Sequence, residues 1–82
     1  MTRRMNWLMA AMQVLSNSRT PMTAREIADA AISEGLRPQR GDFPEYSVQA
    51  AISRDQKANG PASPFVTIAR SGEQNQYRLK GY

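Results

Sequence analysis

A turn followed at once by a helix start divides the N-terminal half of the chain. Residues 16–21 read Ser-Asn-Ser-Arg-Thr-Pro; these side chains compete for backbone hydrogen bonds, and the proline blocks continuation of a helix. Residues 23–26 read Thr-Ala-Arg-Glu, the capping-box pattern in which both end side chains accept hydrogen bonds from free amides at a helix start. The two signals predict that one helix ends near residue 16 and another begins near residue 24.

Apolar residues in both helices recur with the period of an amphipathic helix. The first predicted helix covers residues 6–16, with a core face of Trp7, Leu8, Ala11, Val14 and Leu15. The second covers residues 24–34, with a core face of Ala24, Ile27, Ala28 and Ala31. Gly35 followed by Leu36 indicates a Schellman ending, in which the glycine adopts the left-handed conformation and the leucine folds back onto the helix.

A third helix is predicted from Pro44 to about Lys57, after a loop at residues 37–43, because proline is well tolerated at the first helical position. Its core face consists of Val48, Ala51 and Ile52, with Asp55 at the lower end. At about 100° per residue, the opposite face carries Tyr46, Ala50, Ser53, Arg54 and Lys57, with Gln49 beside them. This second face is polar, basic and free of carboxylate.

The C-terminal part of the chain has the pattern of a β-hairpin. Residues 59–64, Asn-Gly-Pro-Ala-Ser-Pro, end the third helix. Residues 65–70 have the β-branched and aromatic content of a strand, residues 71–75 form the loop, and residues 76–80 alternate as a return strand. Three helices followed by a hairpin predict an α+β fold, a winged helix-turn-helix with a three-helix core and a β-hairpin wing.

Length, composition and charge limit what such a fold can do. The 82 residues suffice for one hydrophobic core, so we expect a single domain over residues 1–82. The chain has no cysteine, which is compatible with a reducing cytoplasm, and no apolar run approaches the roughly 20 residues that cross a bilayer. We therefore expect a cytoplasmic protein with no membrane partner. Its net charge of +4 favours polyanions.

We expect a protein that is not an enzyme and that has neither a cofactor nor a metal site. Without histidine or cysteine the chain lacks the usual base at neutral pH, a Ser-His pair and a zinc cluster. Its carboxylates are scattered over helices and loops, at Asp29, Glu34, Asp42, Glu45, Asp55 and Glu73. The absence of catalytic apparatus is compatible with a position at the N-terminus of a larger protein that carries a catalytic domain.

An ordered set of residues runs through nearly the whole chain. The set is Trp7 with Ala11, Val14 and Leu15; residues 21–23 with Glu26 and Ile27; Gly35 and Leu36; Pro44 with Ala51, Ile52 and Asp55; and Phe65 with residues 77–79. It resembles the HARE-HTH family, winged-helix modules of restriction endonucleases, chromatin-associated proteins and the delta subunit of bacterial RNA polymerase. The resemblance implies an adaptor proposed to bind DNA and to sense its sequence or base modification, in restriction-modification or transcription.

Two positions depart from that family pattern. Family members tend to place a small polar capping residue directly before the proline of the third helix, where this chain has Phe43. Glycine often recurs near the wing tip, where residues 73–76 here read Glu-Gln-Asn-Gln after the single Gly72. This departure predicts a wing that is less tight than in the family, or one that reads DNA differently.

Double-stranded DNA is the expected partner, with the third helix in the major groove. Gln49 and Arg54 have side chains able to reach base edges, and Ser53 is short enough to permit close approach. Tyr46 could stack on, or hydrogen-bond to, a sugar or phosphate, or it could simply cover the loop before the third helix. Phosphate contacts are expected from Lys57, Arg40, Arg70, Arg78 and Lys80.

The same residues also have explanations that need no ligand. Arg54 and Lys57 near the end of a helix would interact favourably with its dipole. Arg70 and Arg78 could pair with Glu73 across the hairpin. Asp55, on the core side, is expected to bond backbone amides or an arginine, because a buried carboxylate needs such partners.

Two other partners stay open at this stage. A protein-interaction adaptor that docks on a polymerase or nuclease component would expose a continuous apolar patch, through Met9, Met12 and Ile32. A homodimer formed through the first helix or the wing would let two third helices address successive major grooves. The DNA interpretation instead requires one basic surface centred on the third helix and including Arg54, Lys57, Arg70 and Arg78.

Overall fold

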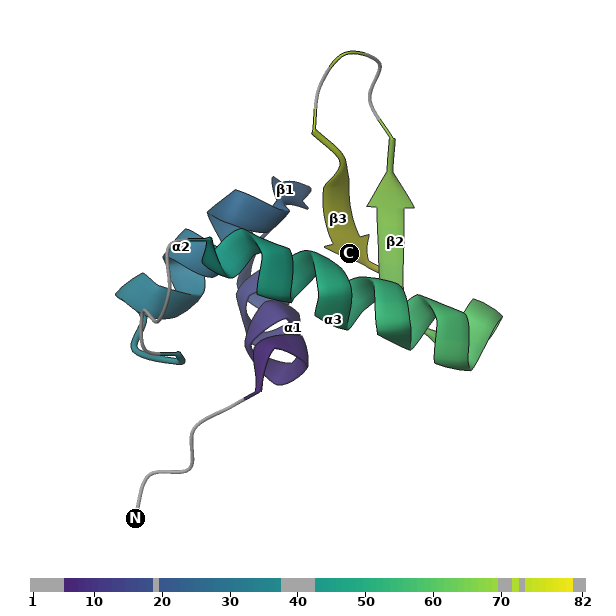
Figure 1. Cartoon of the computed structure of the whole chain (residues 1–82), viewed down its shortest axis with the longest axis horizontal. Coiled ribbons are helices and arrows are strands. Elements are labelled where there is room, and N and C mark those ends of the chain that lie inside the picture. Colours follow the sequence, from purple (N-terminus) through teal and green to yellow (C-terminus); the bar gives the residue numbers. More distant parts are fainter. Residues whose placement is uncertain (1–5, 19, 38–42, 70–71, 73, 81–82) are drawn as a thin grey trace.

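The computed structural model describes residues 6–18, 20–37, 43–69, 72 and 74–80. Its elements in chain order are α1 (Trp7–Asn17), β1 (Met22–Thr23), α2 (Ala24–Ser33), α3 (Pro44–Asn59), the 3-10 turn η1 (Gly60–Ala62), β2 (Phe65–Ile68) and β3 (Gln76–Leu79). Three helices pack beside a small antiparallel sheet, and the β2–β3 hairpin projects from them as a wing (Figure 1). The predicted α+β winged helix-turn-helix fold is confirmed.

Side-chain caps define where α1 and α2 begin. The Asn6 carboxamide oxygen accepts a hydrogen bond from the Met9 amide at 2.8 Å, so α1 starts one residue later than predicted. At the start of α2 the Glu26 amide donates to the Thr23 hydroxyl at 3.2 Å, and the Thr23 amide donates to the Glu26 carboxylate at 2.9 Å. The predicted capping box is therefore confirmed.

The end of α2 also follows the predicted pattern. Gly35 has a φ of 75°, a left-handed conformation that glycine adopts without steric cost. Its amide donates to the Ile32 carbonyl at 3.1 Å, and the Leu36 amide donates to the Ala31 carbonyl at 2.9 Å. This pair of hydrogen bonds is the Schellman motif, and it turns the chain away from α2.

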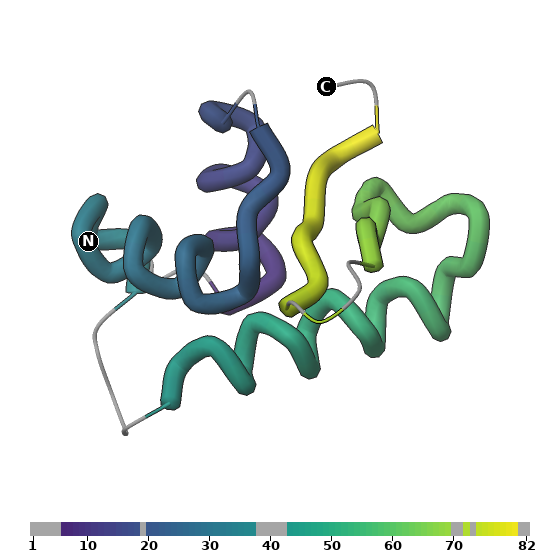
Figure 2. Tube along the Cα trace, turned by 90° about the horizontal axis from the view of Figure 1, so that it is seen from above, coloured from purple at the N-terminus to yellow at the C-terminus, as the bar shows by residue number. Residues whose placement is uncertain are grey.

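α3 begins at Pro44, as predicted, but it ends at Asn59 rather than near residue 57. The extra residues are held because the Asn59 carboxamide donates to the Asp55 carboxylate at 2.8 Å, one turn away. Figure 2 shows α3 running along one side of the molecule, with α1, α2 and the strands on the other side. One long flank of α3 therefore faces away from the rest of the described chain.

The sheet has the strand order β1-β3-β2, and both pairings are antiparallel. Within the hairpin, Phe65 pairs with Leu79 and Thr67 with Tyr77. β1 was not predicted; it is two residues long and pairs Met22 with Tyr77 on the other side of β3. β1 thereby ties the start of α2 to the centre of the sheet.

The core lies between the three helices and the inner face of the sheet. Its buried members are Ala10, Ala11, Val14, Leu15, Ala24, Ile27, Ala28, Ala31, Val48, Ile52, Phe65, Tyr77 and Leu79. Five of these thirteen are alanines, so the helix axes can approach closely. Trp7 and Leu8, expected in the core, pack only partly against it. The buried face of α1 instead includes Ala10, which was not expected there.

A side-chain cluster joins the end of α3 to the start of β2. The Asp55 carboxylate accepts from the Ser63 hydroxyl at 2.6 Å and from Asn59 at 2.8 Å. Ser63 is only 1% exposed, and its oxygen accepts from the Phe65 amide at 3.3 Å. The expectation that Asp55 bonds backbone amides or an arginine was wrong: its partners are two side chains that the turn after α3 brings back.

Gln56 makes a second connection between α3 and the sheet. Its carboxamide nitrogen donates to the Thr67 hydroxyl at 2.9 Å and to the Phe65 carbonyl at 3.4 Å. Both acceptors belong to β2, so one side chain spans from the helix to two positions on the strand. The wing is therefore anchored to α3 by polar contacts as well as by the core.

Removing the Asp55 carboxylate should destabilise the fold. We expect Asp55→Ala to lower the free energy of unfolding by about 1–3 kcal/mol, because the buried Ser63 hydroxyl loses its acceptor. The matched control is Asp29→Ala, which removes a carboxylate from the exposed ion pair with Arg25 and should change stability by less than about 0.5 kcal/mol. Urea unfolding measures both. Equal losses would contradict a structural role for the Asp55–Ser63 contact.

Stability should also depend on pH through Tyr77. Burial raises the pKa of its phenol, because the phenolate is poorly solvated inside the protein. The folded state thus favours the protonated form, and this stabilisation, complete below the usual pKa near 10, is lost as pH rises through the raised pKa. We expect the free energy of unfolding to fall above about pH 10, and to fall less in Tyr77→Phe. The exposed Tyr46 gives the control, Tyr46→Phe, which should keep the wild-type slope. A slope unchanged in Tyr77→Phe contradicts the assignment.

Candidate nucleic-acid interface

Burial of one stripe of α3 turns the opposite stripe outward. Val48 and Ile52, one turn apart, are both 0% exposed, and they orient the helix. The opposite stripe, here called the α3 outer face, consists of Tyr46, Gln49, Ala50, Ser53, Arg54 and Lys57. All of these are exposed except Ala50, which is half-buried. α3 therefore presents together the five residues for which the sequence predicted contacts.

The α3 outer face carries positive charge and no carboxylate. Arg54 and Lys57 lie one turn apart on it. The two acidic residues of α3 are placed elsewhere: Glu45 lines a hollow between α2 and the start of α3, and Asp55 holds Ser63. The charge pattern predicted from the helical projection is therefore present within α3.

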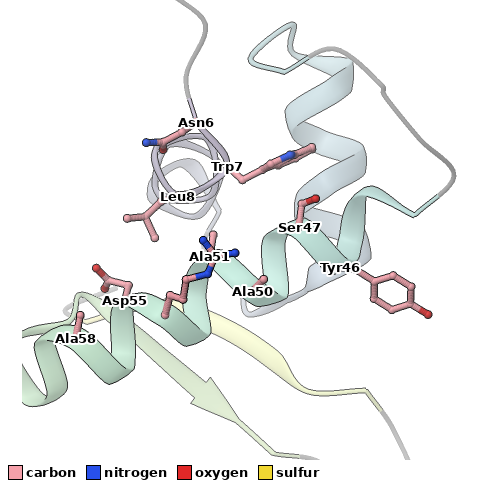
Figure 3. Close-up of a pocket in the computed structure, with 10 residues that line it drawn as sticks. Asn6, Trp7, Leu8, Tyr46, Ser47, Ala50, Ala51, Asp55 and Ala58 are labelled. Atoms are coloured by element: carbon pink, nitrogen blue, oxygen red, sulfur yellow. The ribbon is translucent and has the colours of Figure 1, made fainter.

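A hollow of about 690 Å³ lies beside the outer face, between α3 and the first turn of α1. Trp7 and Leu8 of α1 form one wall, and the floor includes small side chains of α3, at Ala50, Ala51 and Ala58 (Figure 3). Arg54 also lines the hollow, so its side chain borders both the outer face and the hollow. The Arg37 guanidinium lies over the Trp7 ring, 5.3 Å from the ring centre.

Arg78 does not join the α3 outer face. It lies on β3 between the buried Tyr77 and Leu79, and successive residues of a strand point to opposite faces of the sheet. The Tyr77 face is the one next to α3, because Thr67 opposite Tyr77 bonds Gln56. Arg78 thus belongs to the outer face of the sheet, where its guanidinium donates to the Leu79 carbonyl at 3.3 Å.

The remaining residues that were predicted to contact phosphates do not belong to the α3 outer face or lie outside the described residues. The Lys80 ammonium donates to the Pro61 carbonyl of η1, next to the C-terminal end of α3. Arg40 and Arg70 lie outside the described residues, as does Glu73, the suggested cross-strand partner of Arg70 and Arg78. Phosphate contacts by Arg40, in the loop before α3, and by Arg70, after β2, stay predictions.

An aromatic pair at the start of α3 was missed by the sequence interpretation. The rings of Phe43 and Tyr46 have centroids 5.5 Å apart and planes inclined at 38°. The two residues are 61% and 62% exposed. The signal was present in the sequence, since Phe43 stands where a small polar cap was expected. The wall formed by Trp7 was missed as well, because this residue was assigned to the core.

The apolar surface residues do not form the continuous patch that a protein adaptor was expected to expose. Met9 and Met12 are exposed on α1, and with Pro64 and Leu79 they line a hollow of about 460 Å³. Ile32 is half-buried and lines a different hollow, the one between α2 and the start of α3. The predicted patch is therefore divided between two sites.

The described residues offer no metal site, since no three acidic, histidine or cysteine side chains among them come close enough to hold an ion. Nor is any helix in this part of the chain long and apolar enough to cross a membrane. The longest, α3, has 16 residues, whereas a membrane-spanning helix needs roughly 20.

Comparison with protein-family models gives a match over residues 5–74, to the HARE-HTH model, whose description includes the words "restriction endonuclease HTH domain". The matched range extends from the residue before the α1 cap into the wing and includes all of α3. Comparisons with curated proteins and with solved structures gave no match. A helix-turn-helix family suggests a DNA-binding domain. The predicted resemblance is confirmed, and the chain belongs to the HARE-HTH family.

Proposed function

We propose that this domain binds double-stranded DNA by inserting the α3 outer face into the major groove. The observation that carries the proposal is that this face is exposed, basic and free of carboxylate, while the other elements lie behind it (Figure 2). The major groove of B-DNA, about 12 Å wide, admits an α-helix. A carboxylate on the face would repel the phosphates. Neither carboxylate of α3 lies on it: Glu45 lines the hollow beside α2, and Asp55, which holds Ser63, lines the hollow beside α1.

Individual side chains of the outer face have distinct roles in this proposal. Ser53 and Ala50 are short, so the helix backbone can approach the base pairs. Gln49 and Arg54 flank them with side chains that pair in bidentate fashion with adenine and guanine. Lys57, one turn after Ser53, would contact a phosphate and set the position of the helix.

The helix dipole accounts for Lys57 better than for Arg54. Dipole interactions fall off within the last helical turn, and α3 ends at Asn59. Lys57 lies in that last turn, whereas Arg54 lies more than one turn from the end. The helix dipole therefore does not explain the position of Arg54, and a contact with an external partner explains it better.

Phosphate contacts from residues outside α3 complete the proposal. Lys80, held beside η1, lies near the C-terminal end of α3 and would meet the backbone that flanks the groove. Arg40 and Arg70 keep the phosphate roles expected from the sequence. Arg78, on the outer face of the sheet, would meet only DNA that bends around the wing.

We further propose a binding role rather than a catalytic one, as an adaptor for a catalytic domain or protein partner in restriction-modification or transcription. DNA as the partner agrees with the cytoplasmic location expected for a chain without cysteine. Sensing of a base modification would belong to the same outer face, because modified base edges are accessible in the major groove.

A protein-binding function is favoured by one specific observation, the hollow that holds Met9 and Met12. Methionine side chains are flexible and adapt to varied partners, and both are exposed here. The hollow lies between α1 and the base of the wing, where Pro64 and Leu79 complete it. Docking of a partner or of a second copy through α1 would leave the α3 outer face available for DNA.

Loss of Arg54 or Lys57 should weaken DNA binding in different ways. We expect Arg54→Ala to reduce affinity for a random-sequence duplex by about 1–3 kcal/mol and to relax sequence preference. Lys57→Ala should weaken all duplexes alike and reduce the slope of log K against log salt by about 1. Fluorescence anisotropy across a salt series, with an unmodified and a base-modified duplex, measures both effects.

Gln13→Glu is the matched control, because it lowers the net charge by one unit, as Lys57→Ala does, but on α1 beside Met9 and Met12. It should keep nearly wild-type affinity. If it weakens binding as much as Lys57→Ala, only the net charge matters and the α3 contact is refuted. If the wild-type domain binds no duplex at low salt, DNA is not the partner.

A further inference from the structure

The start of α3 exposes more aromatic surface than its fold requires. Phe43 and Tyr46 contact each other, and each leaves more than half of its surface exposed. Neither ring belongs to the core cluster. Figure 3 shows Tyr46 projecting from α3 away from the other labelled side chains. Tyr46 belongs to the α3 outer face, which is proposed to meet DNA, and Phe43 lies directly beside Tyr46.

Phe43 lines the hollow between α2 and the start of α3, but the start of α3 does not require its ring. It is the N-cap of α3, yet its side chain makes no capping hydrogen bond. The Tyr46 amide donates instead to the Phe43 carbonyl at 3.1 Å, a bond that any residue at position 43 could accept. Serine, threonine, asparagine or aspartate would stabilise the helix start better than phenylalanine. The ring thus occupies a position where a polar side chain would improve folding.

The position of the pair relative to α3 indicates what it could contact. Tyr46, Ala50 and Ser53 follow one another along the outer face, at spacings of one helical turn. When a recognition helix enters the major groove, the residues at its N-terminal end contact base edges. The only apolar group that the four bases present in that groove is the C5-methyl group of thymine. Two exposed rings would therefore meet a surface on which thymine alone offers an apolar partner.

We infer that Phe43 and Tyr46 form an apolar contact for thymine methyl groups and give the domain a preference for T over its unmethylated equivalent. The inference rests on the proposed insertion of α3 into the major groove. Within that arrangement, Gln49 and Arg54 contribute hydrogen bonds, and the ring pair contributes a contact that depends on the methyl group. Arg54, separated from Phe43 by most of the helix, would read different base pairs.

The test uses one random-sequence duplex prepared in two forms, with thymidine or with deoxyuridine throughout. The two forms have the same base pairing and differ only in the C5-methyl groups. We expect the wild-type domain to bind the deoxyuridine form about four-fold more weakly for each methyl group contacted. Phe43→Ser should reduce this difference between the two forms, because only the Tyr46 ring of the pair remains. It should also keep its thermal midpoint, because serine caps a helix well.

Two controls separate the methyl contact from other effects. Met9→Ala removes an exposed apolar side chain from α1 and should keep the wild-type ratio between the two duplexes. Tyr46→Phe keeps the ring but removes the hydroxyl, and it should also keep that ratio. A ratio lost in Tyr46→Phe would mean that the hydroxyl, not the ring pair, makes the contact, and would overturn the inference.

Other results would overturn the inference in recognisable ways. Equal wild-type binding to both forms would show that no methyl group is read, while leaving the α3 interface intact. Equal weakening of both forms by Phe43→Ser would indicate a ring that wedges between bases. If Phe43→Ser lowers the thermal midpoint but leaves the ratio of the two affinities unchanged, the Phe43 ring stabilises the fold and does not contact a methyl group. Absence of binding to the thymidine form at low salt would refute the DNA interface itself.

Discussion

Burial of Val48 and Ile52 is the constraint on which the arrangement of this domain depends. These two side chains, one turn apart and inaccessible to solvent, press α3 against α1 and α2 and so fix its rotation about its own axis. A rotation of even one residue position would bring Ser53 or Gln49 into the core, at the high cost of burying unpaired polar groups. The hydrophobic stripe therefore determines which residues α3 presents outward.

The other contacts keep α3 in place without covering its outer face. Asp55 and Gln56, on the flanks of the buried stripe, hold the sheet through Ser63 and Thr67. The alanines of α2 let that helix pack closely behind α3, and Trp7 forms a wall beside it. Contacts behind α3 and on both of its flanks leave one side of the helix open, as insertion into a groove requires.

The sequence predicted the features that depend on neighbouring residues and missed those that depend on distant ones. The capping box, the turn at Gly35 and the start at Pro44 involve residues within one helical turn, so local patterns identified them. β1 was missed because two residues form a strand only when β3 is beside them. Arg78 was expected on the basic surface centred on the third helix, and only the assembled fold shows that its side of the sheet faces away from α3. Asp55 was assigned other partners because the return of the chain to Ser63 has no local signature.

Amide NMR spectra of the labelled domain, titrated with a duplex, show which surface of the protein meets DNA. If it is the α3 outer face, the resonances of Gln49, Ser53 and Lys57 shift or broaden first, while those of Met12 and Ser16 on α1 stay in place. Changes concentrated on α1, with α3 unaffected, would contradict the proposed interface and would assign the interaction to the hollow between α1 and the wing.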